Sequence, residues 1–139
     1  MKVLHIIAQL PSKTGSGVYY TNLIEGFKKY NYQQKAIFGC QDGYCWTVLD
    51  DDHQYPVIFK SEELPFPVVG MSDVMPYDST SYSSMTGEMM SIWKDAFRKK
   101  LEKVKRDFNP SIIFSHHLWI LTSLARKVFP DTKIIGLCH

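Results

Sequence analysis

The pattern of apolar and polar positions is clearest at the start of the chain, where three patterns follow one another. Residues 3–8 form an apolar block rich in β-branched side chains and interrupted only by His5, which is typical of a strand buried on both faces of a parallel sheet. The loop Gly15-Ser16-Gly17 comes next, and apolar residues then recur at helical spacing from Val18 to Phe27. Strand, glycine loop and helix in this order predict half of a nucleotide-binding unit, because free N–H groups at a helix start attract anions.

The rest of the chain alternates short apolar runs with helical patterns. Strands are predicted at residues 35–39, 57–59, 111–115 and 133–138, the last of them buried. A long helix capped by Thr86 buries an apolar stripe and stops at Asn109-Pro110, and a shorter helix covers residues 118–128. We therefore expect a single α/β domain over residues 1–139, with a Rossmann-like, open, mostly parallel sheet and helices on both faces.

Two polar stretches fit no regular element. Residues 61–84 are rich in Pro, Ser, Tyr and Met, and form either a flap that faces the substrate or a surface excursion. Asp50-Asp51-Asp52 is read as a solvated turn, since metal ligands need alternate spacing to converge on one ion.

Charge and cysteine content narrow the class of protein. A net charge of +2 in 139 residues gives no reason to expect a nucleic-acid partner. The basic face of the long helix is read as solvated, and contact with anionic lipid is the less favoured alternative. The apolar start is too short to span a bilayer and lacks a cleavage pattern, so no signal peptide is expected. Three cysteines without a CxxC pair indicate reduced thiols and no zinc site, and we expect a cytoplasmic protein.

Candidate site residues follow three of the predicted strands. In an open parallel sheet, ligands bind beyond the carboxyl ends of the strands. Three features fall there: Gly15-Ser16-Gly17, His116-His117 and His139. We therefore predict that they line one pocket. Because adjacent residues of a strand point to opposite sides, we expect only one of His116 and His117 to face it.

Familiar phosphate-binding motifs do not fit the glycine loop. A dinucleotide fingerprint needs a third glycine where Tyr20 stands, so an NAD site is not expected even though Asp42 lies at a suitable distance for a ribose. No Gly-Lys-Ser/Thr sequence follows the loop, which excludes a Walker motif. No metal-ligating set is apparent around the histidines either.

Several segments nevertheless resemble a known family. The chain resembles the N-terminal domain of the family-4 glycosyltransferases, a retaining group with GT-B architecture. The segments that carry the resemblance are Met1–Ile7 with Pro11 and Gly15-Ser16-Gly17, then Pro110–Trp119, and finally Ile134–His139. Two departures stand out: Ser16 separates two glycines that are often adjacent in the family, and the stretch before the long helix is longer.

The resemblance implies a two-domain enzyme that transfers sugar from a nucleotide-sugar donor with retention and without a metal ion or other cofactor. It implies that Gly15 to Gly17 lie near the donor diphosphate and an acceptor of unknown identity, that His116 or His117 lies on the acceptor side, and that His139 is the catalytic residue beside the donor sugar. The family's C-terminal half, with most of the donor site and two glutamates, is not part of this sequence. We expect the polypeptide to continue beyond His139 into that half, and residues 1–139 alone to fold without activity.

Two alternatives remain open at this stage. One is half of a sugar-nucleotide epimerase, which shares the two-domain architecture. The other is a stand-alone, flavodoxin-like ligand-binding module.

Overall fold

A computed structural model describes all 139 residues and contains one five-stranded sheet in which every strand is parallel to its neighbours. The spatial order is β3-β2-β1-β4-β5. The strands are β1 (Lys2–Ile6), β2 (Gln33–Gln41), β3 (Gln54–Phe59), β4 (Ile112–His116) and β5 (Lys133–Leu137). The helices are α1 (Gly15–Lys28), α2 (Gly87–Asp107) and α3 (Ile120–Val128), with 3-10 turns at Asp51–His53 and Tyr82–Ser84.

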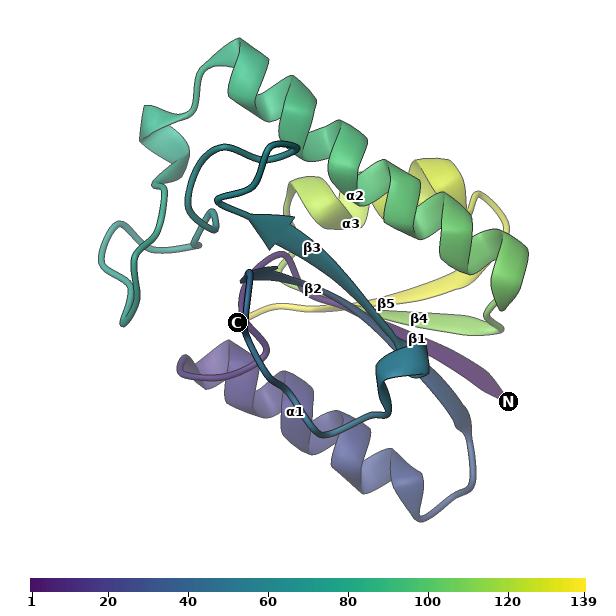
Figure 1. The fold of residues 1–139 in the computed structure, drawn as a ribbon. Coiled ribbons are helices and arrows are strands. Elements are labelled where there is room, and N and C mark those ends of the chain that lie inside the picture. The colour runs from purple at the N-terminus through teal and green to yellow at the C-terminus, as the bar shows by residue number, and fades with distance from the viewer.

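Helices cover both faces of the sheet, with α1 on one side and α2 and α3 on the other (Figure 1). A cluster of 22 buried apolar residues fills the α2/α3 side, around Trp93 and Phe97. A smaller cluster of 9 lies on the α1 side, around Tyr20 and Ile24. The prediction of a Rossmann-like, open parallel sheet with helices on both faces is confirmed, and β1 is buried on both faces as expected.

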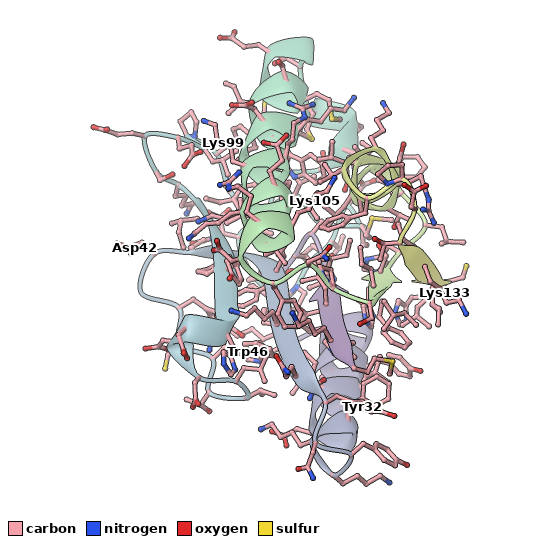
Figure 2. All side chains as sticks on the ribbon, turned by 90° about the vertical axis from the view of Figure 1, so that its right-hand side faces the viewer. Tyr32, Asp42, Trp46, Lys99, Lys105 and Lys133 are labelled. Atoms are coloured by element: carbon pink, nitrogen blue, oxygen red, sulfur yellow. The ribbon has the colours of Figure 1, made fainter.

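The long helix matches its pattern closely. The side chain of Thr86 caps α2 by accepting the N–H of Met89 at 3.1 Å, and its apolar stripe is buried. Its basic face is exposed; Figure 2 labels Lys99 and Lys105, and Lys105 Nζ donates to the carbonyl of Val128 at 2.9 Å. In α1 the pattern is less exact, because Val18 is exposed although the spacing assigned it to the buried stripe.

Strand boundaries differ from the predictions. Strand β2 is longer at both ends because it pairs with β1 from Gln33 onward and with β3 as far as Gln41. Strand β3 includes Pro56, which a strand tolerates when it has a neighbour on one side only. Leu118 lies outside α3 and is exposed.

The prediction that the last strand is buried was wrong. Strand β5 lies at the edge of the sheet and pairs only with β4. Lys133, Ile135 and Gly136 are exposed, and of the apolar residues in this strand only Ile134 packs against the larger cluster. The apolar run predicts a strand correctly but does not reveal its place in the sheet.

Residues 61–84 combine a packed base with an exposed tip. Leu64, Phe66, Val68 and Val69 belong to the larger apolar cluster, whereas residues 71–74 are exposed. Two backbone hydrogen bonds close the base, from Gly70 to Thr80 and from Thr80 to Val68. The segment is thus irregular, as its prolines predict, and it is anchored to the core on the carboxyl side of the sheet (Figure 1).

Candidate functional site at the carboxyl edge of the sheet

The histidines of the site are positioned by the ends of two neighbouring strands. Strand β4 ends at His116, and His139 follows the end of β5 by two residues. The backbone N–H of His117 donates to the carbonyl of Leu137 at 2.9 Å, which extends the pairing of the two strands by one step. His117 itself has a φ of 68°, so the chain leaves the extended conformation immediately after β4.

The three imidazole rings form one cluster. Nδ1 of His116 lies 3.1 Å from Nε2 of His139, and the two rings are almost parallel at an interplanar angle of 9°. The ring of His117 lies 5.2 Å from that of His139, centroid to centroid. The left-handed backbone at His117 breaks the alternation of the strand, so that the rings of both His116 and His117 lie against His139.

Helix α1 contributes two tyrosines that the sequence analysis did not single out. The ring of Tyr19 lies 5.3 Å from His139 and 6.0 Å from His116, and its side chain is partly exposed. Tyr20 packs its ring edge-on against His116 at 5.0 Å and is fully buried. Its hydroxyl donates to the carbonyls of His5 and Ile37, so tyrosine fills the space that a dinucleotide fingerprint keeps for glycine.

Burial sets the protonation of two of the histidines. His116 is 1% exposed and His117 is 9% exposed. Burial, with a smaller effect of the neighbouring His139, lowers the pKa of His116 to about 3 and that of His117 to about 4. Both rings are therefore neutral at pH 7. Nε2 of His116 and Nδ1 of His117 are buried without a hydrogen-bond partner, so these two nitrogens carry unused hydrogen-bonding capacity.

The glycine loop forms the N-terminus of α1. Thr14 caps the helix, since its hydroxyl accepts the N–H of Gly17 at 3.0 Å and its carbonyl accepts the N–H of Val18 at 2.9 Å. The N–H groups of Gly15 and Ser16 have no partner within the helix. No acidic residue lies in the first turn to neutralise this positive end.

The two glycines have different roles. A Cβ at Gly17 would lie 2.6 Å from the backbone N of Ser12 and 2.8 Å from the carbonyl O of Leu10, so close backbone packing requires glycine there. A Cβ at Gly15 would meet nothing within 4 Å. Gly17 is thus needed by the fold, whereas the space beside Gly15 is open.

A buried glutamine connects this loop to the 61–84 segment. Gln9 is 2% exposed, and its Nε2 donates to the hydroxyls of Thr14 at 3.1 Å and Ser16 at 3.0 Å. Its Oε1 accepts the N–H of Met71 at 3.3 Å. One side chain therefore holds both the helix start and the exposed tip.

All the predicted site residues lie at this carboxyl edge. The residues missed by sequence reasoning are Tyr19, Gln9 and the cap Thr14. Thr14 could have been recognised as a cap from its place just before the helical pattern, whereas nothing in the local sequence distinguishes Tyr19 from Tyr20. Asp42 is exposed in the connection after β2.

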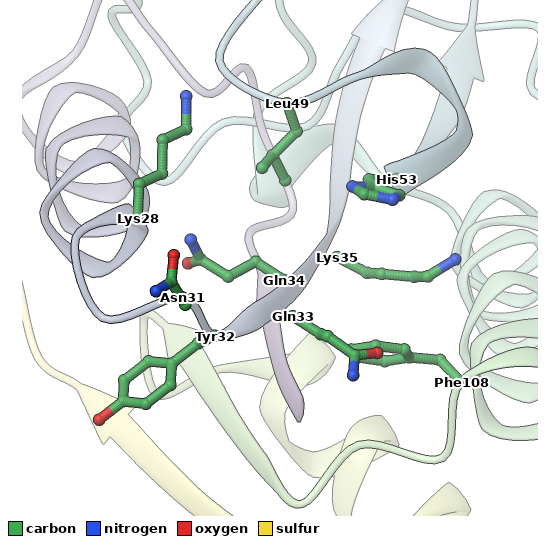
Figure 3. Close-up of a pocket in the computed structure, with 9 residues that line it drawn as sticks. All are labelled: Lys28, Asn31, Tyr32, Gln33, Gln34, Lys35, Leu49, His53 and Phe108. Atoms are coloured by element: carbon green, nitrogen blue, oxygen red, sulfur yellow. The ribbon is translucent and has the colours of Figure 1, made fainter. Parts of the chain in front are cut away.

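The rest of the molecule was searched for other features that could indicate a function. A cavity of 380 Å³ lies at the opposite, amino edge of the sheet, between the end of α1, the start of β2 and Phe108 (Figure 3), and none of the predicted site residues lines it. No group of three or more His, Cys, Asp or Glu side chains has the arrangement of a metal site. None of the helices combines the length and apolar character that crossing a membrane requires.

Comparison with known proteins gives no match to a family model and none to a curated protein sequence. Among solved structures, the chain is similar to the C-terminal domain of a hydrogenase from Pyrococcus furiosus, with a TM-score of 0.62 and 6% identity over 98% of this chain and 90% of that one. It is also similar to the UDP-GlcNAc 2-epimerase from Neisseria meningitidis bound to UDP-GlcNAc, with a TM-score of 0.58 and 14% identity over 99% of this chain and 32% of that one.

A further UDP-N-acetylglucosamine 2-epimerase structure gives a TM-score of 0.55 at 15% identity, over 99% of this chain and 33% of the other. The chain thus spans about a third of the length of these epimerases. At such low identity the likenesses establish the Rossmann-like fold and leave the activity to be argued from the site.

Proposed function

We propose that this chain is the acceptor-side, N-terminal domain of an enzyme that acts on a nucleotide sugar, and specifically of a glycosyltransferase that transfers the sugar with retention. The observation that carries the proposal is the meeting of His116 and His139 beside Tyr19, in the second turn of α1. This puts imidazole rings next to a helix N-terminus. The positive helix end suits a diphosphate, and imidazole nitrogens suit the hydroxyls of a sugar.

In this proposal each feature has a separate task. The free N–H groups of Gly15 and Ser16 bind the donor diphosphate. His139 contacts the donor sugar near the reacting carbon, while His116 and His117, on the acceptor side, hold the ring of His139 in place. The acceptor oxygen forms a bond to the anomeric carbon as the bond from that carbon to the diphosphate breaks, and the acceptor proton leaves to the diphosphate or to solvent.

A second half of the enzyme would complete this site, because one wall leaves the diphosphate in water and supplies few preorganised contacts. We therefore expect residues 1–139 alone to bind the donor weakly and to transfer no sugar. Independence of metal ions and a cytoplasmic location remain predictions in the same proposal.

The second candidate is an epimerase domain. It is supported by the likeness of the fold to UDP-GlcNAc 2-epimerases, one of which is bound to UDP-GlcNAc. Both candidates use the same edge of the sheet for the nucleotide sugar. They differ in the number of substrates, because a transferase needs an acceptor as well as a donor.

The test is a titration of the ¹⁵N-labelled chain with UDP-GlcNAc, following the backbone amides. We expect the largest shifts at Ser16, Tyr19 and His139, and a weaker response in His139→Gln. His53→Gln, which changes a histidine of the amino-edge cavity, is the matched control and should bind like the unmodified chain. Shifts confined to the amino edge, or none at any concentration, would contradict the proposal.

The choice between the candidates needs the chain joined to a second half. With UDP-GlcNAc and no acceptor, an epimerase changes the configuration at C2 of the sugar. A transferase leaves the sugar unchanged until an acceptor is added and then releases UDP. Proton NMR of the reaction mixture distinguishes the two.

A further inference from the structure

A groove of 220 Å³ lies between α2 and α3, the two helices that pack together on one face of the sheet (Figure 1). Lys94 and Arg98 of α2 form one wall. The other wall belongs to α3 and consists of Ile120, Ser123, Leu124 and Lys127. None of the candidate site residues at the carboxyl edge lines this groove, so it is a separate feature of the molecule.

All the ionisable residues of the groove are cations. Lys94, Arg98 and Lys127 line it, and no carboxylate does. The whole chain has 16 basic and 14 acidic residues, so this gathering of positive charge does not follow from the overall composition. Like charges that share a groove repel one another, and an anion bound between them removes that repulsion.

The cations of the groove are little used within the chain. Neither Lys94 nor Lys127 forms an ion pair, and the ammonium group of neither donates a hydrogen bond. Arg98 has one acidic neighbour, Asp95, whose carboxylate lies 3.5 Å from Nη1. Since a guanidinium has five N–H donors, most of those of Arg98 remain free for a ligand.

Cations on the other side of α2, toward β3, do have acidic partners. Nζ of Lys103 lies 3.2 Å from the carboxylate of Asp107 and 5.8 Å from the centre of the Tyr55 ring. Nζ of Lys99 lies 3.2 Å from the carboxylate of Asp95. Both ion pairs have the i,i+4 spacing that stabilises an exposed helix. Lys94, on the groove side, lacks such a partner.

The size and floor of the groove indicate the kind of anion. Leu124 is 5% exposed and Ile120 packs against the larger apolar cluster, so the floor is apolar and strengthens electrostatic attraction above it. The volume is below the range of about 300–1,000 Å³ typical of ligand pockets, which suits one small charged group. A phosphate group offers several acceptor oxygens, and guanidinium groups bind it through paired hydrogen bonds.

We infer that the groove between α2 and α3 binds the phosphate group of a phosphomonoester. Lys94, Arg98 and Lys127 supply the charge, and the hydroxyl of Ser123 supplies a further hydrogen bond. A soluble sugar phosphate and an anionic lipid headgroup both carry this group. The inference goes beyond the proposed function and does not rest on it, because the groove lies away from the carboxyl edge.

The test is a titration of the ¹⁵N-labelled chain with inorganic phosphate at constant ionic strength. We expect saturable shifts at the amides of Ile120 and Ser123. Lys94→Gln and Lys127→Gln should each weaken this binding about tenfold, because each removes a charge-assisted hydrogen bond. Lys103→Gln makes the same change of charge on the other side of α2, and this matched control should bind like the unmodified chain.

The amide of Ser16 keeps the two proposed sites apart in the same spectra. Phosphate shifts at Ser16 report on the helix N-terminus at the carboxyl edge and should be equal in all these variants. Their absence would count against the proposed function and leave the groove untouched. Absence of shifts at Ile120 and Ser123 would refute the groove and leave the carboxyl edge untouched.

Two further ligands distinguish the sources of the phosphate group. Glucose 6-phosphate represents a soluble ester, and vesicles of phosphatidylcholine with or without phosphatidic acid represent a lipid surface. Binding of the sugar phosphate without sedimentation on either vesicle assigns a soluble ligand. Sedimentation on the phosphatidic acid vesicles alone, lost in Lys94→Gln, assigns a lipid headgroup. Both results support the phosphate site.

Thermal unfolding separates binding from folding. Without phosphate, Lys94→Gln and Lys127→Gln should keep or raise the thermal midpoint, because each removes a charge that repels its neighbours. Phosphate should raise the midpoint of the unmodified chain more than that of either variant. A lower midpoint of both variants without phosphate would assign the lysines a structural role and overturn the inference. So would an equal loss of binding in Lys103→Gln, which would mean that phosphate responds only to net charge.

Discussion

Nδ1 of His116 and Nε2 of His139 are 3.1 Å apart, so one ring must donate and the other accept. The shared proton links the end of β4 to the residue that follows β5. Because burial lowers the pKa of His116 to about 3, the ring of His116 is neutral at pH 7.

Stability should fall on acidification because of buried histidines. Burial lowers the pKa of His5 from the ordinary value of 6.5 to about 4, partly offset by the 2.8 Å contact of its Nε2 with Oε1 of Gln34. Between these pH values the unfolded chain binds a proton that the folded chain does not. The stabilising contribution is full above pH 6.5 and decreases as the pH falls toward 4, by up to about 3 kcal/mol for this one residue.

The measurement is urea unfolding as a function of pH. His5→Phe should give a smaller loss of unfolding free energy between pH 6.5 and 4 than the unmodified chain. His116 and His117 act in the same direction and keep part of the slope. An unchanged slope in His5→Phe would show that His5 is accessible to protons in the folded state.

The two glycines of the loop should respond differently to alanine. Gly17→Ala forces a Cβ against backbone atoms of Ser12 and Leu10, and we expect a loss of about 1–3 kcal/mol. Gly15→Ala has open space and should change stability by less than about 0.5 kcal/mol. Urea unfolding compares the two variants directly, and equal effects would mean that the loop adapts to either side chain.

The cap of α1 should matter more than the cap of α2. Thr14→Ala removes the acceptor for Gly17 and also a partner of Gln9, so we expect a cost of about 2 kcal/mol. Thr86→Ala removes only the bond from Met89 and should cost about 1 kcal/mol. Thr14→Ser keeps the hydroxyl and should recover most of the loss in thermal unfolding, whereas failure to recover would assign the effect to the methyl group.

Gln9→Leu should loosen the tip at residues 71–74. The change removes the acceptor of the Met71 N–H and both donors to the helix start, at a cost of about 1–3 kcal/mol. Hydrogen exchange at Met71 should become faster, while exchange in β1 follows only the global stability. Gln33→Leu, at an exposed glutamine, is the control; unaltered exchange at Met71 in Gln9→Leu would show that other contacts hold the tip.

The fold could be predicted from the sequence because each helix and strand has its own local signal. The apolar block of β1, the Thr86 cap and the stripe of α2 each predict one element, and alternation of strands and helices then leads to a parallel sheet. Exposure of β5 was not readable in this way, since the position of a strand in a sheet depends on the strands and helices beside it.

The site could be predicted in part, because its histidines follow the ends of predicted strands. The rule that strand ends meet at one edge brought His116, His117 and His139 together before any geometry was known. The left-handed backbone at His117, with a φ of 68°, was not predicted, because a single backbone dihedral leaves no signal in the pattern of apolar and polar residues. Tyr19 was missed because its role depends on the orientation of α1 above β4.

The free edge of β5, on the side away from β4, affects whether this chain self-associates in solution. Its backbone N–H and C=O groups on that side lack a strand partner, and Lys133 is the only charged side chain in the strand. An unpaired edge of this kind can form backbone hydrogen bonds with an extended segment of another chain. We therefore expect concentrated samples to oligomerise by pairing through the edge of β5. The variant Ile135→Lys should oppose this pairing by charge repulsion between the chains.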